Sequence, residues 1–463
     1  MAETIRRGKI RKPIAPEIVQ YISAPIAEAD FQTSYDTMLD VNRAHVLMLV
    51  KQGIIDRVSA KTILQATEKL AAERIAPDFV ANPKIEDLYT SLEQRLIAAV
   101  GLEVGGRQHT ARSRNDLGAT VVRLDTRAYY LKIATLFLAF RKTLLKAARD
   151  GVDAVMSGYT HMQPSEPITF GHWASGVLSG LARDYSRFSH AWEGLNLNPL
   201  GACSMGSTSF PIDRAYTSRL LGFDAPLQNS IDSVATRDYA VDIVSSLAIA
   251  ADTLSRMAFD LYIWSTPEYG YVEVDDSCAV CSSIMPQKKN PDVPELARGK
   301  TGRVNGHLVG LLTLMKGQPL AYNKDNQEDK EPLFDTVDTV TDTLRIFADM
   351  IGAVTVRHEM MRQAALQGYA TATDLADYLV KKGLPFRDAH EAVARAVRYC
   401  VEKGCDLSEL TLEQMRMFSD LIESDVLKIL TLEGSVGARD HIGGTAPAQV
   451  KKASAALKDR LGR

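Results

Sequence analysis

The sequence predicts an all-α protein whose centre is a bundle of long helices. Apolar residues recur at alternating spacings of four and three in several long runs, which is typical of helices that pack nearly parallel. The runs cover residues 117–145 (with breaks), 170–192, 243–264 and 333–354. No segment predicts a convincing sheet, and residues 271–274 are expected to form a hairpin arm at most.

The length of these runs favours an elongated bundle over ordinary amphipathic helices in separate small domains. A helix from Leu117 to Ala148 would be roughly 45 to 50 Å long at about 1.5 Å per residue. We expect an N-terminal helical domain (1–110), a central long-helix bundle (111–357) and a C-terminal helical domain (358–463). The flanking domains contain shorter helical segments that proline and glycine interrupt.

The composition is that of an ordinary soluble globular protein. The chain has 463 residues, 46% hydrophobic and 24% charged residues, and a net charge of −3, which gives no reason to expect nucleic acid or an anionic membrane as partner. No window of about 18 uncharged apolar residues predicts a membrane span. The basic segment from Met1 to Lys12 is not followed by an apolar run, so we expect no secretory signal.

The five cysteines do not form a disulfide framework, and they fit a reducing cytoplasm. Cys278 and Cys281 have the spacing of a redox pair or of half a zinc site. No second pair and no nearby histidine completes a ligand set. We interpret them as incidental thiols in a functional loop, and we expect neither a metal nor a cofactor.

The first polar segment, residues 110–116, directly precedes the long helix that begins near Leu117. Serine, asparagine and aspartate are common helix caps, so a cap alone would explain it. A helix N-terminus also offers free N–H groups and a positive potential, which suit a carboxylate or a phosphate. Arg112 and Arg114 strengthen this interpretation as an anion site.

The second polar segment, residues 158–164, holds a histidine between glycine and proline. A lone histidine is most often structural or merely exposed. Because His161 is flanked by Thr160 and Gln163, it is a candidate for acid–base chemistry. We expect a helix to start directly afterwards, with Ser165 as a cap and Pro167 in the first turn.

The third polar segment, residues 282–292, places two hydroxyls, two ammonium groups and an amide between prolines. A buried core does not tolerate this mixture, and a solvated loop leaves Ile284 and Met285 unexplained. A site that handles an anion explains both. The connection from about 265 to 292 is long, which is typical of functional loops that close over a ligand. Glu295 begins the next helix and is placed to orient a histidine.

A fourth polar segment, residues 322–331, is charge-rich and is by itself most simply a solvated turn. If the long helices run up and down, residues 110–116 lie at one end of the bundle, and residues 158–164 and 282–292 lie at the other. One site built from all of them would then need different subunits to supply them.

These segments together resemble a known family. The third segment is similar to the signature loop of the fumarase/aspartase superfamily, and the other matches indicate its argininosuccinate lyase branch. Those matches are residues 112–116, 158–163, 322–325 with 327–330, 443–447, and Asn229-Ser230 with Arg237-Asp238. The resemblance implies an almost wholly α-helical subunit of three domains and a homotetramer whose sites are built from three subunits. It also implies the reversible elimination of fumarate from a succinyl-bearing amine.

The resemblance also implies roles for particular residues. Ser282 is the base, and loop closure, backbone N–H groups and Lys288 favour its alkoxide. Lys288 and Asn290 hold the carboxylate that receives charge. His161, paired with Glu295, assists proton transfer or positions the leaving nitrogen. The residues that hold the substrate's carboxylates are Ser113, Arg114, Asn115 and Thr160. The residues that face the amine are Tyr322, Gln327, Lys330 and Arg237. The further substrate-binding positions in these motifs are Arg112, Ser283 and Met285.

The chain departs from the family pattern mainly on the amine side. Asn42 follows Val41 where the family has Gly-Ser, and Tyr89 stands where the family has histidine; Ala111 and Cys281 each replace a glycine. We interpret this as retained chemistry with a changed amine, and we favour an aminopolycarboxylate substrate such as ethylenediamine-N,N′-disuccinate (EDDS). The alternatives are argininosuccinate, with arginine as the amine, and a crystallin-like structural protein on the same fold.

Overall fold

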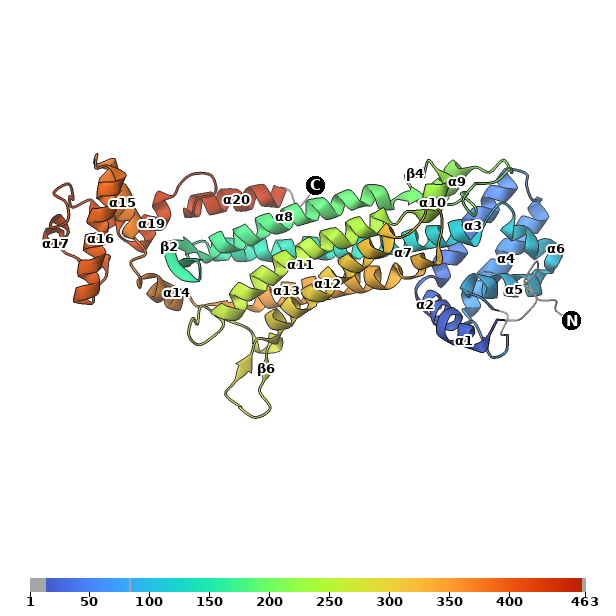
Figure 1. The fold of residues 1–463 in the computed structure, drawn as a ribbon, viewed down its shortest axis with the longest axis horizontal. Coiled ribbons are helices and arrows are strands. Elements are labelled where there is room, and N and C mark those ends of the chain that lie inside the picture. The colour runs from blue at the N-terminus through green and yellow to red at the C-terminus, as the bar shows by residue number, and fades with distance from the viewer. Residues whose placement is uncertain (1–13, 83–84, 460–463) are drawn as a thin grey trace. The chain divides into compact units, whose positions relative to one another are not determined.

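The computed structural model describes residues 14–82 and 85–459 (Figure 1). The chain forms two compact units, and the first holds residues 1–132, 189–244 and 307–337. The second unit holds residues 133–188, 245–306 and 338–463. The division into three domains stays a prediction. The basic N-terminal segment, on which the expectation about a secretory signal depends, lies outside the described residues.

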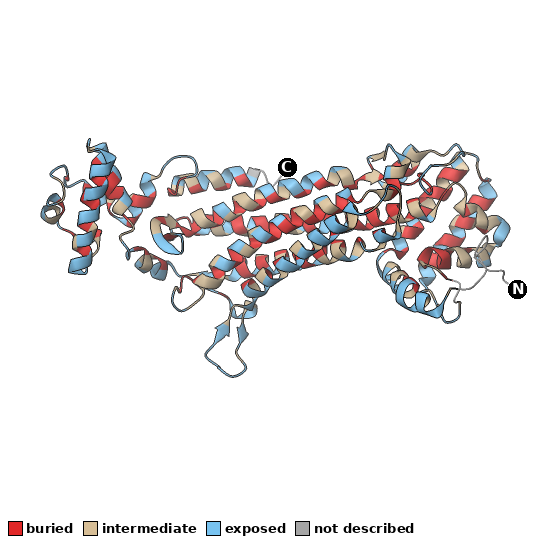
Figure 2. Ribbon diagram, viewed as in Figure 1, coloured by how far each residue is buried: buried red, intermediate tan, exposed pale blue. Residues whose placement is uncertain are grey.

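The longest helices contribute residues to both units, and all but α12 coincide with the apolar runs of the sequence. They are α7 (Arg114–Asp150), α8 (Phe170–Leu195), α11 (Asp238–Trp264), α12 (Asp292–Lys316) and α13 (Lys330–Ala353). α7 has 37 residues, more than the run that predicted it. Rows of buried residues follow these helices, as Figure 2 shows. The buried row of α11 is Ile243, Leu247, Ala250, Leu254, Met257, Leu261 and Trp264.

Aromatic contacts join the long helices. In the second unit, the Phe137 ring of α7 lies 5.8 Å from Phe188 of α8, centroid to centroid. In the first unit, Tyr129 of α7 lies 5.1 Å from Phe334 of α13. Both ring pairs are tilted, and contacts between aromatic rings add to the free energy gained by burying their surface. The prediction of an all-α fold with a long-helix bundle is confirmed.

The rest of the first unit consists of shorter helices and two short strands. Its helices are α1 (Pro16–Ile18), η1 (Val19–Ser23), α2 (Ala24–Thr33), α3 (Tyr35–Lys51), α4 (Arg57–Glu73), α5 (Leu88–Val100), α6 (Leu102–Gly105), η2 (Gly106–His109), α9 (Arg214–Leu221), α10 (Ser230–Ala235) and η4 (Lys324–Gln327). The strands β3 (Leu197–Asn198) and β4 (Ala225–Pro226) pair in parallel. Side-chain caps begin several of these helices: Asp56 accepts from Ser59 N, Asp87 from Thr90 N, and Asn229 from Ile231 N.

The second unit has its own short elements. Its helices are η3 (Asp276–Cys278), α14 (His358–Ala365), α15 (Ala372–Lys381), α16 (Phe386–Lys403), η5 (Leu407–Glu409), α17 (Leu412–Arg416), α18 (Val426–Ile429), α19 (Leu432–Ala438) and α20 (Pro447–Asp459). Buried residues from Leu375 to Leu430 form one apolar cluster in which α15 and α16 pack together. The strands β5 (Val272–Glu273) and β8 (Thr355–Val356) pair over two residues. The expected strand is therefore present, but it pairs with a distant segment and not within a hairpin.

The second unit also contains a hairpin that the sequence analysis missed. The strands β1 (Val155–Thr160) and β2 (Gln163–Thr169) pair antiparallel, so the expected helix start at Ser165 and Pro167 was wrong. Two prolines in β2 removed the strand signal, because proline is rare inside sheets. α8 begins only at Phe170, where Thr169 Oγ1 accepts from His172 N at 3.0 Å.

Gly158 permits this hairpin, since an added Cβ would lie 2.7 Å from the carbonyl oxygen of Glu166. Among the described residues no helix is long and apolar enough to cross a membrane.

Candidate active site

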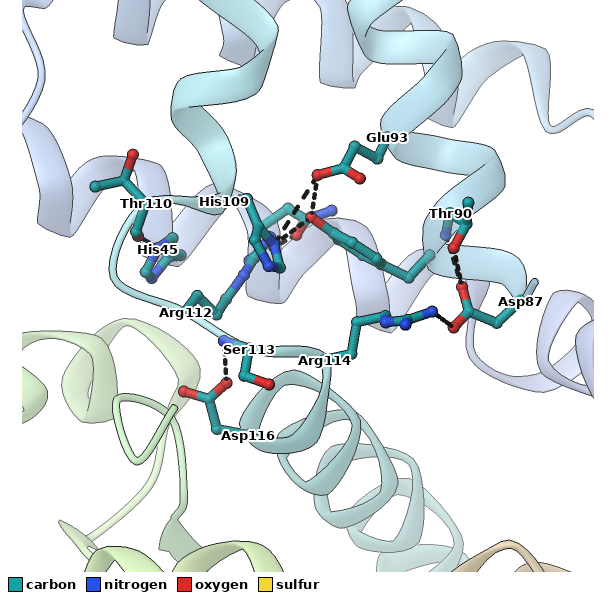
Figure 3. A network of polar contacts seen from close by, with 12 residues as sticks. His45, Asp87, Thr90, Glu93, His109, Thr110, Arg112, Ser113, Arg114 and Asp116 are labelled. Atoms are coloured by element: carbon teal, nitrogen blue, oxygen red, sulfur yellow. Dashed lines mark hydrogen bonds and ion pairs between the residues drawn. The ribbon is translucent and has the colours of Figure 1, made fainter. Parts of the chain in front are cut away.

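The N-terminus of α7 is fixed by a reciprocal cap. Ser113 N donates to Asp116 Oδ1 at 3.0 Å (Figure 3), and Asn115 N donates to Ser113 Oγ at 3.2 Å. Asp116 is fully buried, and its Oδ2 accepts from Gly201 N and Cys203 N, each at 2.9 Å. Burial raises the pKa of Asp116, and these N–H donors oppose the shift. The cap interpretation is therefore correct for Ser113, and its contact with a substrate stays a prediction.

Arg114, the first residue of α7, is held by two carboxylates. Its Nη1 lies 2.8 Å from Asp87 (Figure 3) and 3.0 Å from Glu86. Asp87 at the same time caps α5 through Thr90 N, at 2.7 Å. These ion pairs fix the direction of the guanidinium, whose side chain remains 48% exposed. A ligand carboxylate would meet a cation that is already oriented.

The amine-side positions Asn42 and Tyr89 are joined through Arg112. The buried Arg112 donates from Nη1 to Asn42 Oδ1 at 2.8 Å, and its guanidinium carbon lies 5.5 Å from the centroid of the Tyr89 ring. The Tyr89 hydroxyl is 2.8 Å from Glu93 Oε1 and 2.7 Å from His109 Nδ1. One hydroxyl hydrogen serves one acceptor, so Tyr89 donates to Glu93 and accepts from His109. Asn42 is thus a buried support for Arg112 rather than a lining residue of the cavity described below.

The fourth polar segment is not a solvated turn. Gln327 Nε2 donates to the Tyr322 hydroxyl at 2.6 Å, and Arg237 forms a buried ion pair with Asp329. The Lys330 ammonium lies 3.6 Å from Asp329 Oδ1. Arg237 is 4% and Asp329 1% exposed, so this charge group is taken out of water where η4 leads into α13. The segment is held in place by these mutually compensating buried charges.

Replacement of Arg237 by methionine should lower the free energy of unfolding by about 3–5 kcal/mol, because removing one partner leaves a buried carboxylate poorly compensated. Denaturation in urea measures this loss. The matched control is Arg362→Met, which removes an exposed ion pair with Glu433 and should cost no more than about 1 kcal/mol. Equal losses in the two variants would contradict the structural role given to Arg237.

The first unit contains a cavity of about 360 Å³. Predicted site residues from four separate stretches of the chain line it. They are Tyr89, Arg114, Asn115, Arg237, Tyr322, Gln327 and Lys330. The first and fourth polar segments therefore meet at one place, together with Tyr89 and Arg237. The sequence analysis missed the wall that residues 14–38 supply, which includes Asp30.

The second unit presents His161 at the tip of the β1–β2 hairpin. Thr160 pairs with Gln163, so His161 and Met162 form the turn, with φ of 53° and 58°. Both residues are exposed. A left-handed conformation at two successive non-glycine residues costs free energy and is often found at functional sites.

The third polar segment is a loop between two paired strands, β6 (Val280–Cys281) and β7 (Lys289–Asn290). Ser282 N donates to Lys288 O at 3.0 Å, which closes the loop. Ser282 Oγ accepts from Met285 N at 3.2 Å and from Ile284 N at 3.4 Å. Backbone donors directed at this oxygen favour its negatively charged form.

The charged residues of this loop differ in their partners. Lys289 lies 2.6 Å from Asp276, whereas Lys288 has no carboxylate partner in the described part of the chain. Ser283, Met285 and Lys288 are exposed, and Asn290 is half-buried at the end of β7. Glu295 lies in the first turn of α12, as expected. Within one chain the described residues contain no bond between Glu295 and His161, so this pairing stays a prediction. No group of metal-ligating side chains occurs in residues 14–82 and 85–459.

The chain matches a family model described as Lyase over residues 26–306 and one described as Argininosuccinate lyase C-terminal over residues 369–437. It is 51% identical over 459 residues to an argininosuccinate lyase of Janthinobacterium sp. (strain Marseille), covering 98% of this chain and 97% of that protein. It is 53% identical over 424 residues to the argininosuccinate lyase of Cupriavidus necator, covering 90% of each.

Solved structures share the fold. An EDDS lyase variant with bound fumarate has a TM-score of 0.86 at 30% identity, covering 97% of this chain and 91% of that one. A class II fumarase from Schistosoma mansoni has a TM-score of 0.71 at 16% identity, covering 87% and 90%, and shows the fold alone.

The fold and these likenesses define a fumarate-releasing carbon–nitrogen lyase. The chain belongs to the argininosuccinate lyase branch of the fumarase/aspartase superfamily.

Proposed function

We propose that this lyase cleaves argininosuccinate into arginine and fumarate. The observation that carries the proposal is the cavity of the first unit, where Arg114, Asn115, Gln327 and Lys330 meet. It offers cations and amide groups to a substrate that bears several carboxylates. The relatives that are about half identical over nearly the whole chain are argininosuccinate lyases, which supports arginine as the amine.

The sequence analysis favoured an aminopolycarboxylate such as EDDS, and the relatives favour its alternative instead. EDDS remains the second candidate because of one observation. Tyr89, which stands where the family has histidine, lines the cavity and is tied to Glu93 and His109. The likeness to EDDS lyase is lower in identity, at 30%, so it weighs less than the likeness to the argininosuccinate lyases.

The chemistry begins with removal of a weakly acidic proton. The proton on Cβ of the succinyl group passes to the Ser282 alkoxide, and the electron pair spreads into the neighbouring carboxylate. Lys288 and Asn290 stabilise this charge, since donors that are already in place act most strongly where charge develops. The contacts of Ser282 Oγ with Met285 N and Ile284 N support its role as base.

The electron pair then forms the double bond of fumarate as the carbon–nitrogen bond breaks. The leaving nitrogen takes up a proton, which His161 supplies or directs while Glu295 orients the imidazole. Ser113, Arg114, Asn115 and Thr160 hold the carboxylates so that the proton and the leaving nitrogen lie on opposite sides. These roles, and those of Arg112, Ser283 and Met285, rest on the match to the family's motifs.

The active form is proposed to be a homotetramer with sites shared between subunits. The residues of one site are divided within a chain: Arg114, Gln327 and Lys330 belong to the first unit, and His161 and Ser282 belong to the second. α7 alone separates Arg114 from the hairpin by 37 residues of continuous helix. A site that uses both groups is most simply completed by neighbouring copies. A cytoplasmic location stays a prediction.

The test supplies fumarate together with arginine, ethylenediamine or ammonia and follows the loss of fumarate absorbance. Arginine should be consumed with fumarate in equal amounts, and mass spectrometry should identify argininosuccinate. Preferential use of ethylenediamine would support the second candidate. No consumption with any amine, and no fumarate release from a panel of N-substituted aspartates, would favour the crystallin-like structural role.

A further inference from the structure

One wall of the cavity is a row of side chains spaced four residues apart. The row is Ile14, Ile18, Ile22, Ile26, Asp30, Ser34 and Met38. In an α-helix each step of four residues turns the side chain by about 40° away from the previous one, because a full turn takes 3.6 residues. The π-helical turn η1 (Val19–Ser23) widens the helix within this row and takes up part of the drift. The row therefore keeps one face toward the cavity.

Asp30 interrupts this otherwise largely apolar row with a carboxylate. Glu86 and Asp87 also line the cavity, but both are bound to Arg114. The Asp30 carboxylate has no hydrogen bond or ion pair within the described residues. Lys330 is the cation that interacts electrostatically with Asp30, and its ammonium already forms an ion pair with Asp329. Among the described residues, Asp30 is thus the carboxylate of the cavity that is available to bind a ligand.

Burial raises the pKa of Asp30 to about 6. Lys330 lowers this pKa, whereas Asp87 and Asp329 raise it. Asp125, which accepts hydrogen bonds from Ser34 and Thr37, is a further neighbouring carboxyl. Ionising the buried Asp30 costs free energy unless a cation is close to it. A bound cation would therefore stabilise the ionised carboxylate and would itself bind more tightly.

We propose that Asp30 accepts a hydrogen bond from a positively charged nitrogen of the leaving amine, while the isoleucine row packs against the amine's alkyl chain. This inference rests on the proposed function and adds a specificity-determining residue to it. An alkyl chain that ends in a cation matches an apolar wall followed by a free carboxylate. A dicarboxylate such as fumarate gains nothing from either feature.

The test compares arginine with two analogues as inhibitors of fumarate release. Citrulline lacks the guanidinium charge, and Nα-acetylarginine lacks the ammonium charge. In the native protein one of these analogues should inhibit about 10- to 100-fold less strongly than arginine, because a hydrogen bond between charged groups is lost. Asp30→Asn should abolish this difference, with the KM for fumarate in the reverse reaction unchanged. The matched control is Glu28→Gln, an exposed acid on the same helix α2, which should retain it.

The pH dependence gives a second readout that needs no variant. Protonation of Asp30 below about pH 6 removes the acceptor, so inhibition by arginine should weaken as the pH falls through 6, and inhibition by the discriminating analogue should not. Asp30→Glu should restore part of the discrimination. The inference is overturned if Asp30→Asn discriminates as the native protein does, or if neither analogue differs from arginine in the native protein. Failure of arginine to react with fumarate in the native protein defeats the proposed function instead.

Discussion

Replacement of Ser282 by alanine should lower kcat for fumarate release by about 10³-fold or more, because the proposed base for the Cβ proton is lost. The backbone donors Met285 N and Ile284 N are directed at this oxygen, so the alanine variant keeps an arrangement with no base in it. The rate at which fumarate absorbance appears at saturating substrate gives kcat. The substrate's KM should change little, since Ser282 contributes mainly in the transition state.

The matched control for this prediction is a serine in the same connection, residues 265–292. Ser277 is exposed, and its hydroxyl donates to Asp275 Oδ1 at 2.6 Å. Ser277→Ala should retain kcat within about a factor of two, since a surface change away from the reacting atoms is close to neutral. Near-normal turnover of Ser282→Ala would remove Ser282 as the base. A loss of the assembly or of thermal stability in that variant would mean that the serine supports the loop.

The helices were predictable because burial follows their period. The row from Ile243 to Trp264 is buried along α11, and the same periodicity located α8 and α13. The β1–β2 hairpin was not predictable, because β1 is buried almost throughout and Pro164 and Pro167 mask β2. Neither strand has the alternation that predicts a half-buried strand.

The site was predictable only in part, and for a similar reason. Gln327 and Lys330 were assigned by the family motif, since their local sequence alone indicated a solvated turn. Gln327 donates to Tyr322, and Lys330 lies beside Asp329. The other partner of Asp329 is Arg237, which only the fold brings to this segment. Asp30 carries no motif at all. Its signal was the spacing of four that it shares with Ile18 and Ile26, which a π-helical turn makes into one face.

Mixed assemblies of two inactive variants should recover activity if the sites are shared between subunits. Ser282→Ala removes the proposed base in the loop between β6 and β7, and His161→Asn removes the imidazole at the tip of the β1–β2 hairpin. When different subunits supply these residues to one site, some sites of a mixed tetramer receive both intact. Activity should rise at least about tenfold above either parent variant, because an intact site works independently of the damaged ones.

The experiment uses two affinity tags, so that only assemblies holding both variants are purified and assayed. The matched control combines Ser282→Ala with Lys288→Met. Ser282 N donates to Lys288 O, so these two residues reach a site together on one loop, and their mixed assemblies should stay inactive. Recovery in the first mixture and none in the second assigns the hairpin and the loop to different subunits. Equal inactivity of both purified mixtures would instead place His161 and Ser282 in a site supplied by one chain.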